Sequence, residues 1–284
     1  MASGALAPDF WRRALRNRSF VVGGALTLLV VAAGLLSLLW TPWPPNVTDM
    51  PLKLKPPSGA HWLGTDHYGR DLLARLMVGA WNSLLVGLVA VGLGLGLGVL
   101  LGALAATWRG WADEALSRFS DLVFAFPAVL SAVLITGLLG PGAINAIIAI
   151  GIFNIPVFAR VTRNAALASW SRDYVRAAVA LGQGPVTITL RHVLPNIASL
   201  LIVQATIQFA VAILAEAALS FLGIGVQPPE ASWGRMLNDS LTYMYVQPGL
   251  AIFPGLAILL AVLGLNLLGD GLRDLLDPRL RRRV

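Results

Sequence analysis

The sequence predicts an all-α integral membrane protein with six transmembrane helices and both termini in the cytoplasm. Its composition, its long uncharged stretches and the distribution of its arginines lead to this fold class. Of the 284 residues, 57% are apolar and only 12% are charged, and the mean hydropathy is +0.74. A soluble domain carries about 45–50% apolar and about 25% charged residues. The composition therefore excludes a soluble enzyme, and it equally excludes a disordered chain.

Stretches that lack Asp, Glu, Lys and Arg place the helices. A spanning helix needs about 20 apolar residues to cross about 30 Å of hydrocarbon. The stretch 122–159 is long enough for two spans, and Gly140-Pro141-Gly142 near its middle marks a turn between them. In chain order, the predicted helices cover residues 19–40, 81–107, 119–139, 142–161, 197–222 and 249–269.

The basic residues give the orientation, because loops that remain in the cytoplasm are enriched in Lys and Arg. If the N-terminus is inside, the inner segments hold sixteen of the twenty-one Lys and Arg residues. The net charge of +7 is thus a signal of topology, and we expect no nucleic-acid partner. The first helix is longer than a signal-peptide core of about 7–15 residues, so we expect it to stay uncleaved. The inner segments are 1–18, 108–118, 160–196 and 270–284.

The first outer loop contains the only local pattern that resembles a metal site. His61, Asp66 and His67 lie close together in sequence, but two histidines six positions apart in a loop are a weak ligand signal. We therefore expect no metal here. Thr65 or Asp66 is expected to cap a short helix whose apolar residues, at helical spacing, are Leu72, Leu73, Leu76 and Met77.

The second predicted helix is rich in glycine. Gly94, Gly98 and Gly102 recur every four residues, which places them on one face and lets another helix approach closely. We interpret this row as a helix-packing surface. A nucleotide-binding function does not fit, because no strand precedes the glycines and their spacing departs from G-x-G-x-x-G.

The fifth predicted helix carries three polar residues that are unusual in a membrane span, Gln204, Gln208 and Glu216. Polar residues within the membrane are costly and are functional candidates by default. Two interpretations remain open at this stage. The three side chains line a transport pathway, or Glu216 lies in the bundle interior and pairs with a neighbouring helix.

The inner segment 160–196 predicts two short helices with a sharp turn between them. Gly182 is placed as a helix stop, and Gly184-Pro185 restarts a helix. Small residues on the first of these helices allow close approach by another protein. The predicted contact residues are Asp173, Tyr174, Arg176, Ala177, Ala178, Leu181, Gly182, Leu194 and Pro195.

This segment resembles a known motif. Arg176-Ala177-Ala178-x3-Gly182-x9-His192-x-Leu194-Pro195 is similar to the EAA motif of permeases in binding-protein-dependent ABC importers, with Arg in place of Glu and His in place of Ile. Both departures are common in the dipeptide, oligopeptide and nickel branch. The stretches Leu63–Asp66 with Gly69–Asp71, Ala215–Gly223 and Asn266–Arg279 resemble the same branch, and the match is closest to the dipeptide permease C type.

The resemblance implies a type I importer permease, without catalytic residues of its own. It would pair with a homologous second permease, with two ATPase subunits below that bind ATP and Mg, and with an extracytoplasmic substrate-binding protein. Residues 1–80 would form an N-terminal tail, a first helix and an outer loop. Residues 81–270 would form the importer domain, with a coupling loop at about 170–195, and 271–284 a cytoplasmic tail.

The implied substrates are dipeptides or oligopeptides, with glutathione and nickel chelates as alternatives of the same architecture. A self-sufficient secondary transporter is the remaining alternative. The chain has no G-K-[ST] phosphate loop, so it cannot hydrolyse ATP itself. An intramembrane hydrolase is not supported, because the chain has no cysteine and only three histidines.

Overall fold

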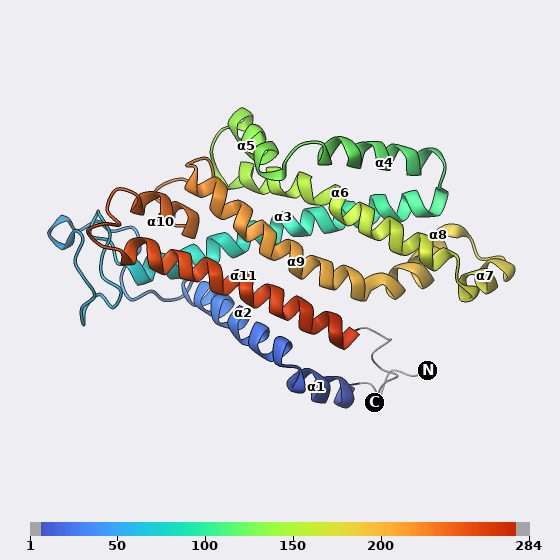
Figure 1. The fold of residues 1–284 in the computed structure, drawn as a ribbon, viewed down its shortest axis with the longest axis horizontal. Coiled ribbons are helices and arrows are strands. Elements are labelled where there is room, and N and C mark those ends of the chain that lie inside the picture. Colours follow the sequence, from blue (N-terminus) through green and yellow to red (C-terminus); the bar gives the residue numbers. More distant parts are fainter. Residues whose placement is uncertain (1–6, 277–284) are drawn as a thin grey trace.

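The computed structural model describes residues 7–276, which form a helical bundle elongated along one axis (Figure 1). Within this range no strand is assigned, and one isolated antiparallel bridge joins Thr65 and Asp71. In chain order the helical elements are α1 (Ala7–Arg16), α2 (Arg18–Leu36), η1 (Met50–Leu52), α3 (Leu72–Trp108), α4 (Trp111–Phe124), α5 (Ala128–Leu139), α6 (Ala143–Trp170), α7 (Asp173–Ala180), α8 (Pro185–Ile188), the π-helical turn η2 (Thr189–Val193), α9 (Leu194–Phe221), α10 (Trp233–Ser240) and α11 (Gly249–Leu276).

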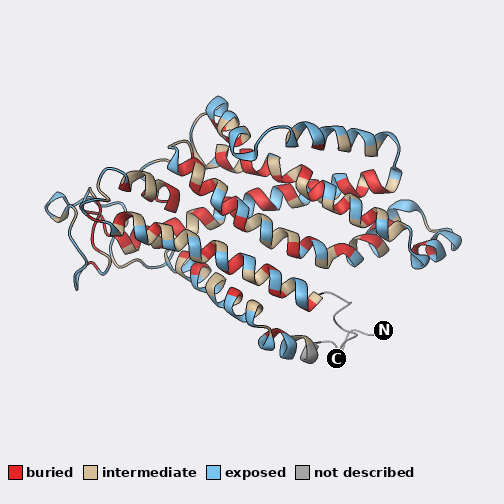
Figure 2. Cartoon of the chain, in the orientation of Figure 1, coloured by how far each residue is buried: buried red, intermediate tan, exposed pale blue. Residues whose placement is uncertain are grey.

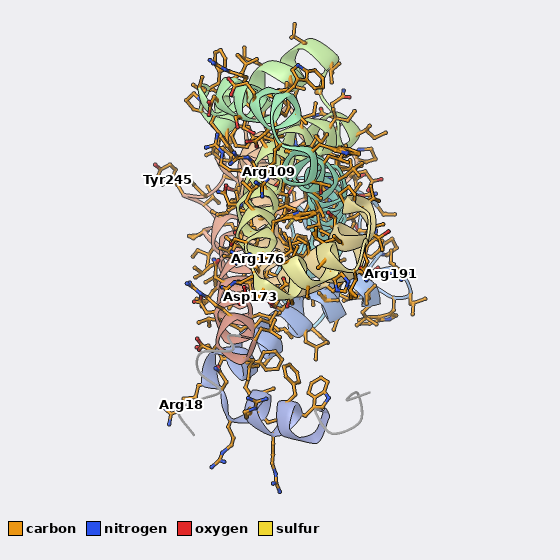
Figure 3. The ribbon with its side chains drawn as sticks, turned by 90° about the vertical axis from the view of Figure 1, so that its right-hand side faces the viewer. Arg18, Arg109, Asp173, Arg176, Arg191 and Tyr245 are labelled. Carbon is orange, nitrogen blue, oxygen red and sulfur yellow. The ribbon has the colours of Figure 1, made fainter. Side chains whose placement is uncertain are left out.

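The bundle has two different ends. The loop end holds residues 37–71 and α10, and the basic end holds α1, α7, α8 and the last turns of α11 (Figure 1). Figure 3 looks toward the basic end and labels four of its arginines, Arg18, Arg109, Arg176 and Arg191.

Five helical segments are long and apolar enough to cross a membrane, namely α2, α3, α6, α8 to α9 and α11. The pair α4–α5 supplies a sixth if it is counted as one broken span. The outward faces of these helices are exposed in Figure 2, yet they carry large apolar side chains such as Leu28, Leu88 and Leu138. An apolar exterior of this kind is suited to lipid.

The third predicted helix, 119–139, is wrong as a single straight span. In the structure α4 and α5 are bent by 86°. Pro127 lies at the break and precedes α5. Proline cannot donate a backbone hydrogen bond and disfavours helical geometry at the residue before it, so the chain turns between Ala125 and Pro127.

Four other predicted helices are longer than expected, among them α11, which continues to Leu276 instead of ending at residue 269. α3 begins at Leu72 instead of residue 81, because the side chain of Asp71 accepts a hydrogen bond from the Ala74 N–H at 2.8 Å and caps it. The predicted separate short helix is thus the first part of α3, and its cap is Asp71. α6 continues to Trp170. Leu194-Pro195 does not interrupt the chain, because the π-helical turn η2 leads directly into α9 and Pro195 lies in the first turn of α9.

Two helices are absent from the sequence prediction. α1 precedes the first span, and α10 lies between the last two spans at the loop end. Trp233 of α10 is fully buried, and its indole N–H donates to the Leu76 carbonyl of α3 at 3.1 Å. α10 therefore packs into the end of the bundle and belongs to its core.

Candidate functional site

The segment between α6 and α9 forms two short helices joined by a glycine turn at the basic end. Asp173 lies in the first turn of α7. The N–H of Gly182 donates to the Val179 carbonyl at 2.9 Å, and Gly182 has a φ of +75°, in the left-handed region that favours glycine. Pro185 then occupies the first turn of α8. The predicted stop and restart are therefore where the structure places them.

Two side chains of α7 hold it against the bundle. Val175 is buried, and Ala178 is only 4% exposed. Both pack in a cluster with Ile188, Val193 and Ile197 from α8, η2 and α9. The sequence predicts that Ala178 faces a partner, whereas the structure directs it into this chain's own core, because α7 packs against α6 and α8.

The remaining predicted coupling residues lie mostly on the outside of this tip. Ala177 and Tyr174 are exposed, and Leu181 is 79% exposed. Exposed apolar side chains at Val179 and Val186 extend the same surface. Among the other predicted residues, Arg176 pairs with Asp173 at 3.5 Å, Leu194 is half-buried and Pro195 is exposed. The tip thus presents an apolar surface beside charged groups.

The glycine row of α3 faces α6. A Cβ added at Gly98 would lie 2.6 Å from the Phe158 Cβ, and one added at Gly102 would lie 2.8 Å from the Thr162 Cβ. Gly94 faces α6 at equally close range. Real Cβ atoms do not approach other atoms so closely, so the two helices can pack at this distance only because the row lacks side chains.

Glu216 is 0% exposed and lies in the last turns of α9. The hydroxyl of Ser83 on α3 donates to its Oε2 at 2.8 Å, and the hydroxyl of Ser220 donates to its Oε1 at 2.7 Å. Ser232, the residue that caps α10, lies beside the carboxylate. Glu216 therefore connects α9 with α3 and α10, which favours the bundle-interior interpretation.

The other two polar residues of α9 lie elsewhere. Gln204 lines a hollow of about 370 Å³ between α9 and α11, together with Ser199 and Arg273. Gln208 is half-buried one turn later. Because Glu216 lies twelve positions after Gln204, the two are about 18 Å apart along the helix. The structure therefore does not bring the three predicted pathway residues together.

A long apolar groove between α3 and α9 is an open feature that sequence reasoning missed. Its volume is about 700 Å³. Gly92 and Gly96 on α3 open into it, and a Cβ added at either would meet no atom within 4 Å. The sequence signal for this groove was that Gly92 and Gly96 alternate along α3 with the packed glycines Gly94 and Gly98. The groove is lined by Leu88, Val91, Gly92, Leu95, Gly96, Val99, Ala198, Leu201, Ile202, Ala205, Thr206 and Phe209.

A network of buried charges holds the loop end together. The Arg70 Nε donates to the Asp66 carboxylate at 2.7 Å, and the Arg75 Nε lies 3.6 Å from the same carboxylate. Asp239 of α10 pairs with Arg235 at 3.1 Å and lies 4.0 Å from Arg70. This network joins the first loop to α10, so the loop end is an ordered surface.

The histidines of the first loop have partners of their own. His61 Nδ1 lies 2.9 Å from the Asp71 carboxylate, and His67 stacks on Tyr243 with ring centroids 5.1 Å apart. Burial lowers the pKa of His67 below its ordinary value, so the ring is neutral at pH 7. Within residues 7–276, no group of three His, Asp or Glu side chains is arranged to hold a metal ion.

Comparison with known proteins decides the family. Residues 98–282, more than half of the chain, match the family described as "Binding-protein-dependent transport system inner membrane component". The chain belongs to this family. Residues 6–57 match the "N-terminal TM domain of oligopeptide transport permease C", which places the chain in the dipeptide and oligopeptide branch.

Full-length relatives agree with this assignment. The chain is 42% identical to the "Glutathione transport system permease protein GsiD" of Pectobacterium atrosepticum over 274 residues, which cover 96% of this chain and 91% of that protein. It is 41% identical to the protein of the same name from Escherichia coli O6:K15:H31 over 274 residues, 96% of this chain and 90% of the relative.

Solved structures give the fold. The inward-facing MetNI methionine ABC transporter matches with TM-scores of 0.59 and 0.60 in two structures, each at 20% identity. The matches cover 70% and 72% of this chain and 95% and 97% of the matched chains. The fold is that of a type I ABC importer permease. The chain is a non-catalytic, multi-span permease subunit of an inner-membrane importer, and such permeases act with ATPase subunits and a substrate-binding protein.

Proposed function

We propose that this chain forms half of the translocation pathway of an ATP-driven importer of peptides. It pairs with a homologous second permease in a complex with two ATPase subunits, and residues 170–195 couple it to the ATPase subunits. The match to an oligopeptide permease domain and the glutathione permeases among its relatives support this substrate class, because glutathione is itself a peptide derivative. This chain holds no ATP or Mg, and both bind to the ATPase subunits.

The basic end faces the cytoplasm in this proposal, and both termini lie there. The excess of arginine in the segments of that end supports this orientation. The predicted domain boundaries at residues 80 and 270 fall inside the continuous helices α3 and α11, and the last part of the 271–284 tail lies outside the described residues. The loop end then faces outward, where its ordered surface meets the binding protein.

The groove between α3 and α9 is the surface that we assign to the second permease and the pathway. It is apolar and open along several turns of both helices. Exposed glycines on α3 permit close approach of a partner backbone. Gln204 lines the hollow between α9 and α11, and neither Gln204 nor Gln208 is among the residues that line this groove.

The exposed tip of α7 is the observation that supports the proposal, because it combines the motif with an apolar surface that residues 7–276 leave uncovered. Ala177→Asp and Leu181→Asp place a charge on that surface without entering the core. Each should leave the permease pair assembled but reduce ATPase co-purification at least tenfold, because an unpaired charge would be buried in the contact. Ala115→Asp on the exposed face of α4 is the matched control.

Uptake and ATP turnover complete this experiment. In both α7 variants, ATP turnover in proteoliposomes should no longer respond to loaded binding protein, whereas the Ala115→Asp complex should respond as the wild type does. Normal ATPase recovery together with normal uptake in both α7 variants would refute the coupling role of this segment.

The substrate is tested separately. The binding protein encoded beside this chain is purified and screened by thermal shift against dipeptides, tripeptides, glutathione and a nickel chelate. A stabilising peptide or glutathione that also stimulates ATP turnover of the complex supports the proposal. Stabilisation by the nickel chelate alone would overturn the peptide assignment while leaving the permease function intact.

A further inference from the structure

α1 separates apolar from basic residues on two faces. At 100° per residue, Phe10, Ala14, Trp11 and Leu15 fall within an arc of about 140°. The basic residues Arg12, Arg16 and Arg13 fall within an opposite arc of about 100°. This segregation is characteristic of helices that lie in the interface between water and lipid.

The protein itself covers only a narrow strip of the apolar face. Ala14 is 0% exposed where α1 packs beside α2 and α11. Trp11 and Leu15, on the flank of the same face, are 59% and 72% exposed. The ring of Phe10 packs edge-on against that of Trp11, with centroids 5.6 Å apart. α1 therefore keeps an apolar surface that the described part of this chain leaves open.

α1 also lies at the level where two spans end. Asn17 interrupts the helix, and its side chain accepts a hydrogen bond from the Phe20 N–H at 2.9 Å to cap α2. Its amide also donates to Asp274 near the end of α11 at 3.3 Å. The charged residues Arg18 and Asp274 mark this level as the end of both apolar segments.

The direction in which α1 runs also agrees with a position at the level where α2 and α11 end. It leaves the line of α2 at the basic end of the bundle (Figure 1), and Figure 3, viewed along the long axis, shows it extending sideways from the bundle. A helix in this place meets the boundary between headgroups and acyl chains. Tryptophan favours that boundary, and arginine reaches toward phosphate groups.

We propose that α1 is an interfacial helix that binds the anionic phospholipid surface next to α2. Trp11 and Leu15 enter the boundary of the acyl chains, and Arg12 and Arg16 contact lipid phosphates. Charge complementarity selects this occupant, because an apolar flank bordered by several arginines matches an acidic membrane surface. The inference concerns anchoring and is independent of what the chain transports.

Site-directed spin labelling tests the placement, and the absence of cysteine from this chain keeps the background low. Single cysteines at Leu15 and Arg12 are labelled in the full-length chain, purified with its co-assembling subunits. The complex is reconstituted in nanodiscs of phosphatidylethanolamine with about 30% phosphatidylglycerol, which supplies the anionic headgroups. For each spin label, the collision rate with oxygen is compared with the collision rate with a water-soluble nickel chelate.

The Leu15 label should favour oxygen over the nickel chelate several-fold, and the Arg12 label should show the reverse. Equal access of the nickel chelate to both labels would overturn the proposal, because α1 would then lie in water. Exclusion of both reagents from the Leu15 label would also overturn it, because another protein subunit would then cover that face.

Lipid charge is tested with the same labels. Replacing phosphatidylglycerol by phosphatidylcholine should move the Leu15 label toward water, and Arg12→Gln with Arg16→Gln should produce the same shift in the acidic nanodiscs. Leu138→Cys, on the outward face of α5, is a control whose label should not respond to lipid charge. Unchanged depth of the Leu15 label in both comparisons would overturn the role of anionic headgroups.

Discussion

The hydroxyl of Ser83 on α3 donates to the carboxylate of Glu216 on α9 at 2.8 Å, although 133 positions separate the two residues in the sequence. Each of the two carboxylate oxygens also has a donor within this chain, since Ser220 supplies the second. The carboxylate of Glu216 thereby has its hydrogen-bond partners inside the protein, and this acidic side chain in a span makes no contact with lipid. Its position explains how α3, α9 and α10 are held together at the loop end.

Replacing Glu216 with leucine should destabilise the folded permease more than replacing it with glutamine. Leucine leaves buried serine hydroxyls without an acceptor, which costs about 1–3 kcal/mol, whereas glutamine keeps one acceptor and the shape. The midpoint of thermal unfolding of the purified full-length chain with its second permease measures the difference.

Asn266→Leu is the control for the Glu216 variants, because Asn266 is an exposed polar residue in a span. It should leave the midpoint close to that of the wild type. If Glu216→Leu is as stable as the wild type, the serine cluster does not hold the helices. If Glu216→Gln folds normally but loses uptake, the residue belongs to the pathway instead.

Gly98 and Gly96 lie two positions apart on α3 and should respond oppositely to valine. Gly98→Val forces α3 away from α6, because an added Cβ would lie 2.6 Å from the Phe158 Cβ, and overpacking typically costs about 1–3 kcal/mol. Gly96→Val enters open space. The yield of monodisperse protein in detergent should fall for Gly98→Val and stay normal for Gly96→Val.

The Gly96 variant also reports on the groove. If the second permease approaches there, Gly96→Val should reduce uptake or pairing despite a normal fold of this chain. Equal yields of the two variants would contradict the packing seen between α3 and α6.

Ala178 and Ala177 are adjacent on α7 but face different surroundings. Ala178→Asp buries a charge among Val175, Ile188 and Val193, so it should destabilise the α7–α8 tip itself. Ala177→Asp should leave the tip folded. Limited proteolysis of the permease pair without ATPase subunits should cleave the Ala178→Asp tip faster, and similar cleavage rates would contradict the placement of Ala178.

Gly182→Arg should partly resemble Ala178→Asp in its effect on the α7–α8 tip. Gly182 has a φ of +75° and no atom within 4 Å of an added Cβ, so backbone strain rather than crowding determines the effect. A left-handed conformation costs a residue with a side chain roughly 1–2 kcal/mol. Asparagine tolerates the left-handed region, so the Gly182→Asn complex should bind the ATPase subunits better than the Gly182→Arg complex. Equal loss of ATPase binding in both variants would show that the exposed surface, and not backbone strain, determines the effect.

The orientation predicts the labelling of cysteines by a membrane-impermeant reagent on intact cells. Cysteines at Ser58 and Thr242, both exposed at the loop end, should react. A cysteine at Ser3, which lies outside the described residues, should react only after permeabilisation. Reaction at Ser3 together with protection at the loop end would reverse the orientation.

The helices and the membrane-protein class could be predicted from the sequence. The length of an apolar stretch and its lack of charged residues are properties of each segment alone. The glycine turn at Gly182 and the restart at Pro185 were also predictable, since each depends on the backbone preferences of its own residues. The break at Pro127 was missed, although the proline is visible, because an uninterrupted apolar run outweighed it. α1 was missed because its length is well below that of a span.

The sequence by itself determined that this chain crosses a membrane repeatedly, and its motif indicated the importer family. Only the tertiary structure decided which face of each helix is used. Periodicity places Ala177 and Ala178 on the same small-residue surface, yet packing of α7 on α8 buries one and exposes the other. Likewise, one hydrogen-bond donor to Glu216 comes from α3, far away in the sequence. Such contacts depend on which helices become neighbours, and that choice is made by the whole bundle and not by any one segment.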